Sequence, residues 1–195
     1  AALTDGVGVL DIELASDERD ALRGYNLLSG KPILFIANVG ESDAADGGAA
    51  VDALRQQVGE DRLLIVSAQI EAELAQLDDL EEITAFLAEL GLTQRGVERL
   101  IQGAYRLLDL ITFYTLANNK LQAWQLPRGI QAPMAAGRIH SDMEDGFIRA
   151  EVASVEDVIQ VEGQMSRLRE QGKLRTEGRN YALADGDVVT FLFRD

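Results

Sequence analysis

Two short runs of consecutive apolar residues stand out in the first third of the chain. Ile33–Ala37 and Leu63–Val66 lack the alternation of a half-exposed strand. Each run therefore predicts a strand covered on both faces, as in a parallel sheet. Between them, an acidic, glycine-rich loop at Gly40–Gly48 leads into a helical pattern over about Ala49–Val58. The order strand, helix, strand predicts a βαβ unit with parallel strands.

A helical pattern follows the second strand, from Glu71 to about Leu116. Gly91 is the expected end of one helix, and Thr93 is the expected N-cap of the next. Apolar residues recur with helical spacing in both and are expected to be core rather than cofactor contacts. They are Ile83, Phe86, Leu87 and Leu90 in the first helix, and Val97, Leu100, Ile101, Tyr105 and Leu108 in the second.

The pattern changes after Asn118-Asn119, where we place a boundary between domains 1–120 and 121–195. The following segments read as strand, helix, strand, helix and two closing strands: Leu121–Leu126, Ala132–His140, Phe147–Val152, Val155–Gln171, and the runs on either side of Ala184-Asp185-Gly186. An Asp-Gly pair between alternating runs is typical of a hairpin. Mixed strands around a helix in so short a segment predict a small α+β domain.

Composition limits the possible functions. The apolar share of 47% and the charged share of 26% are ordinary for a globular protein. No apolar run is long enough to cross a bilayer, and the start AALTDGVGVL lacks the features of a signal peptide. The chain has no cysteine, which excludes disulfides and thiolate sites and favours the cytoplasm. Its net charge of −15, concentrated in residues 1–120, argues against DNA or membrane partners for that part.

One stretch near the C-terminus is locally basic, although Glu170 and Glu177 interrupt it. It is either a solvated helix and turn or a contact surface for an anionic partner. The residues are Arg167, Arg169, Lys173, Arg175 and Arg179.

No segment fits a phosphate-binding loop. The nearest match to G-x-x-x-x-G-K-[ST] is GYNLLSGKP, Gly24 to Pro32, which has one residue too many and a proline in place of the magnesium-binding hydroxyl. It also precedes the first strand, whereas a phosphate loop follows a strand. We therefore reject it and expect no catalytic residue in this chain. No aspartate-rich loop suggests a metal site either.

The segment after the first strand is similar to the base-reading loop of guanine-specific switch proteins, Asn-Lys-x-Asp. Asn38, Val39, Gly40 and Glu41 occupy those positions here. Val39 lacks the lysine stem that covers the base. An ionised Glu41 only accepts hydrogen bonds, so it would attract the amino group of adenine and repel its N1 atom. These substitutions weaken guanine specificity without establishing a preference for adenine.

The second strand ends in a loop that suits the same role. Ser67, Ala68 and Gln69 match the Ser-Ala loop whose backbone lies beside the base in such proteins. Asn-x-x-Glu alone also occurs in plain loops, but two strands in this order with both loops favour a base-binding site. The expected contacts are Asn38, Val39, Glu41, Ser67, Ala68 and Gln69.

The only histidine, His140, is followed at alternate positions by Asp142 and Glu144. Alternation would place the three on one face of an extended segment, as in a metal site. Turn-forming neighbours make an extended segment doubtful, so we expect instead a histidine that holds a helix end. No metal site is predicted.

Several long segments resemble one known family. Residues 132–152, APMAAGRIHSDMEDGFIRAEV, and 172–193, GKLRTEGRNYALADGDVVTFLF, closely resemble the C-terminal TGS domain of the YchF-type Obg-like ATPases. KPILFIANVGE and AWQLPRG fit the same family in the same order, so the resemblance covers about residues 25–195. It implies an α/β P-loop domain of Rossmann-like type, represented in part, and an α+β, β-grasp, ubiquitin-like domain.

The resemblance also implies a function. Members of this family are P-loop nucleotide-triphosphatases that prefer ATP, although many are described as GTP-binding proteins. They use Mg²⁺, and Asn-x-x-Glu, here Asn38 and Glu41, replaces the guanine-reading motif. They associate with ribosomes, and the TGS domain is regarded as a module that contacts RNA or the ribosome. The basic stretch Arg167–Arg179 would be the contact patch. The alternative is a non-enzymatic interaction module acting through the β-grasp domain.

The chain departs from the family by lacking the phosphate loop, the switch region and the helical insertion. We expect a fragment, or a chain without its N-terminal part, that alone neither holds a triphosphate tightly nor hydrolyses it, because phosphoryl transfer needs the phosphate-loop lysine and magnesium ligands. The start at Ala rather than Met fits processing or truncation.

Overall fold

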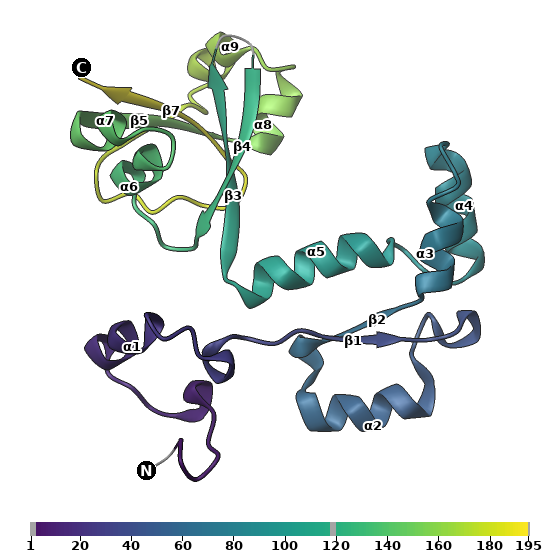
Figure 1. The fold of residues 1–195 in the computed structure, drawn as a ribbon. Coiled ribbons are helices and arrows are strands. Elements are labelled where there is room, and N and C mark those ends of the chain that lie inside the picture. Colours follow the sequence, from purple (N-terminus) through teal and green to yellow (C-terminus); the bar gives the residue numbers. More distant parts are fainter. Residues whose placement is uncertain (1–2, 118–119, 195) are drawn as a thin grey trace. The chain divides into compact units, whose positions relative to one another are not determined.

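The computed structural model describes residues 3–117 and 120–194, and the chain divides into two compact units, Ala1–Leu108 and Asp109–Asp195. Both units mix helices and strands (Figure 1), so the α/β character expected from the sequence is confirmed. Within these described residues, no helix is long and apolar enough to span a membrane.

The first unit contains the predicted βαβ arrangement. Strands β1 (Phe35–Asn38) and β2 (Leu63–Val66) form a parallel pair in which Asn38 lies opposite Val66, and helix α2 (Gly48–Val58) connects them. Helices α2 and α5 (Gly96–Leu107) pack on β2, one on each side of the strand pair (Figure 1). The prediction of cover on both faces is wrong for β1, because Ile36 is 48% exposed.

Two helices beyond β2 build the main core of this unit. Helix α3 (Ala68–Leu74) and helix α4 (Leu80–Glu89) bury Ile70, Leu74 and Leu87 against Ala44. The apolar positions predicted for the first helix pack there, and Gly91 follows it with a positive φ of 69°. The segment before β1 contains helix α1 (Ser16–Arg23) and short 3-10 turns at Val9–Asp11 and Leu28–Gly30. Two further 3-10 turns, Glu41–Asp43 and Glu60–Arg62, flank α2.

The orientation of α5 differs from the prediction. Val97, Ile101 and Leu108, expected in the core, are 41%, 54% and 53% exposed. The helix instead turns glycine toward the sheet, because a Cβ on Gly103 would lie only 2.9 Å from Leu64 Cδ1. The close approach that glycine permits outweighs burial of the apolar stripe.

The start and end of α5 also differ from the prediction. Thr93 is not its cap: Arg95 occupies the N-cap position, without a side-chain hydrogen bond. The helix ends at Leu107 rather than near Leu116, and strand β3 (Leu110–Ala117) follows. Leu110–Leu116 alternates between buried positions, such as Ile111 and Phe113, and less buried β-branched or aromatic ones, which stabilises a strand over a helix.

The predicted domain boundary, Asn118-Asn119, lies outside the described residues. On either side of it β3 pairs with β4 (Lys120–Pro127) from Leu110↔Pro127 to Ala117↔Lys120. The two compact units separate earlier, between Leu108 and Asp109. The assignment of 1–120 and 121–195 to two named domain types stays a prediction.

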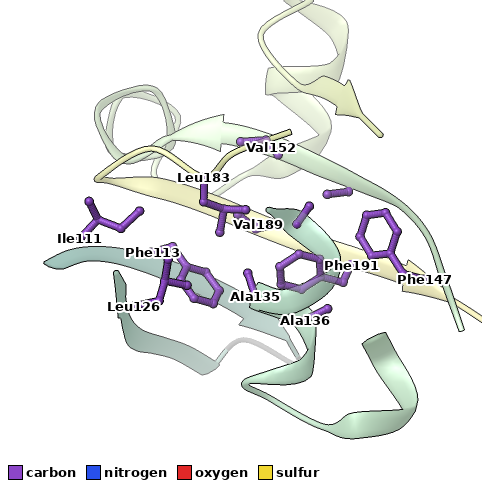
Figure 2. Packing of buried hydrophobic residues seen from close by; sticks show 12 residues of the cluster. Ile111, Phe113, Leu126, Ala135, Ala136, Phe147, Val152, Leu183, Val189 and Phe191 are labelled. Atoms are coloured by element: carbon purple, nitrogen blue, oxygen red, sulfur yellow. The ribbon is translucent and has the colours of Figure 1, made fainter. Parts of the chain in front are cut away.

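The second unit is a five-stranded mixed sheet in the order β4-β3-β7-β5-β6. Strand β7 (Asp187–Phe193) runs parallel to β3 and antiparallel to β5 (Phe147–Ser154), and β6 (Arg175–Glu177) pairs with the outer edge of β5. Four short helices accompany the sheet: α6 (Ala132–Gly137), α7 (Ser141–Asp145), α8 (Val155–Gln160) and α9 (Met165–Glu170). Figure 2 shows side chains from the strands and α6 pointing into one interior.

The hairpin predicted around Asp185-Gly186 is wrong. The residues before it do not pair with β7: Ala182 forms an isolated bridge with Gln131, and both edges of β7 are occupied by β3 and β5. The turn is instead held by β3, because Asp185 Oδ1 accepts a hydrogen bond from Thr112 N at 2.7 Å. A local turn signal does not specify which strands pair.

Candidate functional site

The ends of β1 and β2 bring the two predicted base-binding loops together. Because the strands are parallel and Asn38 lies opposite Val66, their carboxyl ends lie at the same edge. Asn38 Oδ1 accepts a hydrogen bond from Ala68 N at 3.0 Å, and Val39 N donates to Val66 O at 3.0 Å. The first loop is therefore attached to the second by one side-chain and one backbone hydrogen bond.

Among the other residues predicted to contact the base, some are exposed and one has a structural role. Ser67 is 5% exposed and is the N-cap of α3, where its Oγ accepts from Ile70 N at 3.5 Å. Gln69 is exposed and donates to Glu73 Oε1 at 3.2 Å. Glu41 is exposed at the start of the turn Glu41–Asp43. The structure thus assigns a folding role to the Ser67 hydroxyl and leaves the Glu41 carboxylate accessible.

The hydrogen bond of Asn38 determines what this corner can bind. Since its Oδ1 accepts from the backbone, its Nδ2 remains as a donor, and the residue is exposed. A purine ring nitrogen is an acceptor suited to such a donor, and an exocyclic amino group is a donor suited to Glu41. The corner offers both kinds of group within two loops that are linked to each other.

Glu71 of α3, which follows the second loop, links that helix to the start of α5, a role that was not predicted. Its Oε1 accepts from Gly96 N, and its Oε2 lies 3.7 Å from Arg95 Nε. The carboxylate thereby stabilises the N-terminus of α5, where helix N–H groups lack partners. The contact spans 25 residues of sequence, so no local pattern could have indicated it.

Neither the rejected phosphate-loop match nor His140 forms the site that its sequence pattern could suggest. Leu28–Gly30 of the rejected phosphate-loop match forms a 3-10 turn before β1, not after a strand. No group of three or more metal-ligating side chains occurs among residues 3–117 and 120–194. His140 is the N-cap of α7, where its Nδ1 accepts from Asp142 N at 3.2 Å, as expected for a histidine that holds a helix end.

The basic stretch of the second unit is largely engaged in contacts inside that unit. Arg169 Nη2 contacts both carboxylate oxygens of Glu151, at 3.0 and 2.9 Å. Lys173 Nζ lies 2.6 Å from Asp157 Oδ1, and this hydrogen bond, followed by that from Ser154, lowers the pKa of the Asp157 carboxyl. These cations are therefore partly neutralised, which weakens their attraction for a distant anion.

The last two basic residues also have structural partners, whereas the first is exposed on α9. Arg175 lies 3.4 Å from Asp187 Oδ1 and over the ring of Tyr181. Arg179 donates to Phe147 O at 3.1 Å. Arg167 has no ion-pair partner among the residues that the structure describes. A contact patch here would depend mainly on Arg167.

Comparisons with known proteins show which proteins this chain is similar to. Residues 110–194 match the YchF-GTPase_C family model, described as a protein of unknown function, DUF933. The Ribosome-binding ATPase YchF of Escherichia coli O157:H7 is 41% identical over 184 residues, which cover 93% of this chain and 50% of that protein. The protein of the same name from Bacillus subtilis (strain 168) is 41% identical over 186 residues, with 93% and 50% covered.

Solved structures share the fold. The Schizosaccharomyces pombe YchF GTPase superposes with a TM-score of 0.81 at 23% identity, covering 98% of this chain and 51% of that one. A GTP binding protein from Pyrococcus horikoshii OT3 gives a TM-score of 0.61 at 17% identity, covering 99% and 63%. The chain spans about half the length of the curated relatives that it matches. The chain is similar to YchF proteins over nearly its whole length, and the family model that matches residues 110–194 describes the C-terminal domain of these proteins.

Proposed function

We propose that this chain supplies the base-recognition part of a ribosome-associated nucleotide-triphosphatase that prefers ATP to GTP. The observation that carries the proposal is the hydrogen bond from Ala68 N to Asn38 Oδ1, which joins the two loops at the ends of β1 and β2. The relatives are named ribosome-binding ATPases, which supports ATP hydrolysis as the reaction and the ribosome as the partner. We therefore propose that the protein acts in the cytoplasm. The exposed Glu41 supports recognition of an amino-bearing base.

The parts of the chain have different roles in this proposal. The first unit is the base-binding portion of a P-loop domain, and the second unit is a β-grasp TGS domain that contacts ribosomal RNA or protein. Asn38 and Glu41 bind the base edge, while Val39 and the exposed Ala68 and Gln69 line the base. Residues beyond this chain bind the triphosphate and Mg²⁺. When bound, the magnesium ion would neutralise the charge that develops on the phosphates.

The substitution Asn38→Asp tests the base contact without breaking the link between the loops. A carboxylate still accepts from Ala68 N, but the Nδ2 donor is lost. We expect binding of a fluorescent ATP analogue to the full-length protein that contains this chain to weaken about tenfold or more, because one hydrogen bond to the base is lost. Thermal unfolding should change little.

Asn26→Asp is the matched control, since it makes the same charge change at an exposed residue far from both loops in sequence. Its affinity should stay within about twofold of the unmodified protein. Equal affinities for Asn38→Asp and the unmodified protein would remove Asn38 from the base site.

A further inference from the structure

A second candidate site lies along the other edge of β2, away from the base-binding loops. An open pocket of about 690 Å³ follows Leu63–Ile65 and is lined by the C-terminal part of α2, Ala45 in the loop before it, the turn Glu60–Arg62 and α5. All of these elements belong to the first unit. In the part of the chain that the structure describes, β2 pairs only with β1, so no strand covers this edge.

The pocket is basic in a strongly acidic protein. Its lining includes four arginines and two carboxylates, whereas the whole chain has a net charge of −15. The arginines come from three different elements, and we call the site the arginine pocket; they are Arg55, Arg62, Arg99 and Arg106, and the carboxylates are Glu60 and Asp61. Cations gathered from separate segments, with this net balance, favour an anionic ligand.

The arginines of α5 are aimed at this edge by the helix packing described above. Arg99 and Arg106 flank Gly103 at spacings of four and three residues, so all three share one face of α5. Gly103 contacts Leu64, with the close approach that only a glycine permits. This face therefore holds the stems of both arginines beside β2.

One buried hydrogen-bond donor of the arginine pocket has no acceptor among the described residues. Arg99 Nε is buried, and it has neither a hydrogen-bond acceptor nor an ion-pair partner among residues 3–117 and 120–194. Leaving such a donor without an acceptor is costly, because the buried Nε–H loses its water without gaining a partner. A ligand oxygen placed there would satisfy it.

The other arginines differ in how far they are already engaged. Arg55 is held by two carboxylates, with its Nε 2.6 Å from Glu60 Oε2 and its Nη1 close to Asp52, so it is neutralised. Within the described part of the chain, Arg62 donates only its Nε, to Val58 O at 2.9 Å, and this contact leaves its two Nη groups as donors. The guanidinium groups of Arg62, Arg99 and Arg106 therefore line the pocket with N–H donors available for a ligand. Asp61 is the one lining carboxylate that does not pair with Arg55.

We propose that the arginine pocket binds a phosphate group, either a free phosphate or one in the backbone of an RNA strand. Guanidinium groups match the geometry of phosphate oxygens and form charge-assisted, often bidentate hydrogen bonds with them. Arg99 and Arg106 make the main contacts, and Arg62 makes a third. The lining of the arginine pocket includes none of the six residues predicted to contact the base.

Spectra that resolve the arginine Nε–Hε groups test this directly on the 195-residue chain. Inorganic phosphate is added in one series and a short single-stranded RNA in another. We expect the Arg99 Nε–Hε signal to shift in the manner of a newly formed hydrogen bond, with Arg106 following. A shift with phosphate alone identifies a free-phosphate site, and tighter, salt-sensitive binding of the RNA identifies a backbone site.

Variants link the signal to affinity. Arg99→Gln with Arg106→Gln should weaken binding about tenfold or more, because two charge-assisted contacts are lost. Arg138→Gln with Arg149→Gln makes the same charge change at exposed positions of the second unit and should change binding less than about twofold.

The unmodified chain keeps the proposal testable even if the double glutamine variant fails to fold. Absence of any shift at Arg99 and Arg106 with both ligands, or shifts confined to other arginines, would overturn it. An equal loss of affinity in the control variant would also overturn it, since binding would then depend only on overall charge.

Discussion

Replacing Phe113 with alanine is expected to lower the free energy of unfolding of the second unit by about 4 kcal/mol. The Phe113 side chain is fully buried in the middle of β3, at the centre of the cluster in Figure 2. Its ring meets that of Phe191 edge to face, with centroids 6.1 Å apart, and Phe191 in turn meets Phe147 at 6.2 Å. Alanine would leave a cavity and remove one aromatic contact.

Urea unfolding followed by tryptophan fluorescence measures this loss in the intact chain. Trp124 is the only tryptophan and packs against the same core, so its signal reports on the second unit. Leu121→Ala is the control, because Leu121 is 61% exposed, and it should cost less than about 0.5 kcal/mol. A loss near that value for Phe113→Ala would mean that Phe113 is not at the centre of this core.

The substitution Asp187→Ala should lower the free energy of unfolding of the second unit by about 3 kcal/mol, because it removes a buried carboxylate that accepts three part-buried hydrogen bonds. Asp187 is 3% exposed at the start of β7. Its Oδ2 accepts from Tyr181 OH at 2.7 Å and from Ala184 N at 2.9 Å, and its Oδ1 accepts from Arg175 at 3.4 Å.

The tyrosine in this network remains a donor over the ordinary pH range. Burial, followed by the hydrogen bond to Asp187, raises the pKa of Tyr181, so its hydroxyl stays protonated. The same urea experiment measures the variant. Asp187→Asn keeps one acceptor and should lose about half as much, whereas Glu170→Ala, at an exposed helix end, should lose almost nothing. Equal losses for Asp187→Ala and Glu170→Ala would contradict the network.

The sequence predicted those elements whose signal is local. The aliphatic run of β2 and the helix before it were placed within a residue of their observed bounds, because continuous apolar runs and glycine boundaries act over a few residues. The apolar spacing in α5 gave a wrong prediction. Val97 and Ile101 recur as core residues would, but the close approach at Gly103 determines which face of the helix packs on the sheet. Which strands pair with β7 depends on contacts remote in sequence, and a local Asp-Gly signal does not contain them.

The candidate site shows the same limit. Asn38 and Ala68 could be named from their positions at two strand ends, and the structure joins them by a hydrogen bond. The role of Glu71 and the gathering of Arg62, Arg99 and Arg106 could not be predicted, because each requires knowing how α5 packs on β2. Residues that act across elements become visible only once the elements are placed.

Competition between ATP and GTP analogues for the full-length protein that contains this chain tests the central claim most directly. We expect the ATP analogue to bind about tenfold more tightly, because the Glu41 carboxylate accepts from the adenine amino group and lacks the geometry of the aspartate that reads guanine. Equal or tighter binding of the GTP analogue would contradict the preference for adenine. No binding of either nucleotide would contradict the base-recognition role of Asn38 and Glu41 altogether.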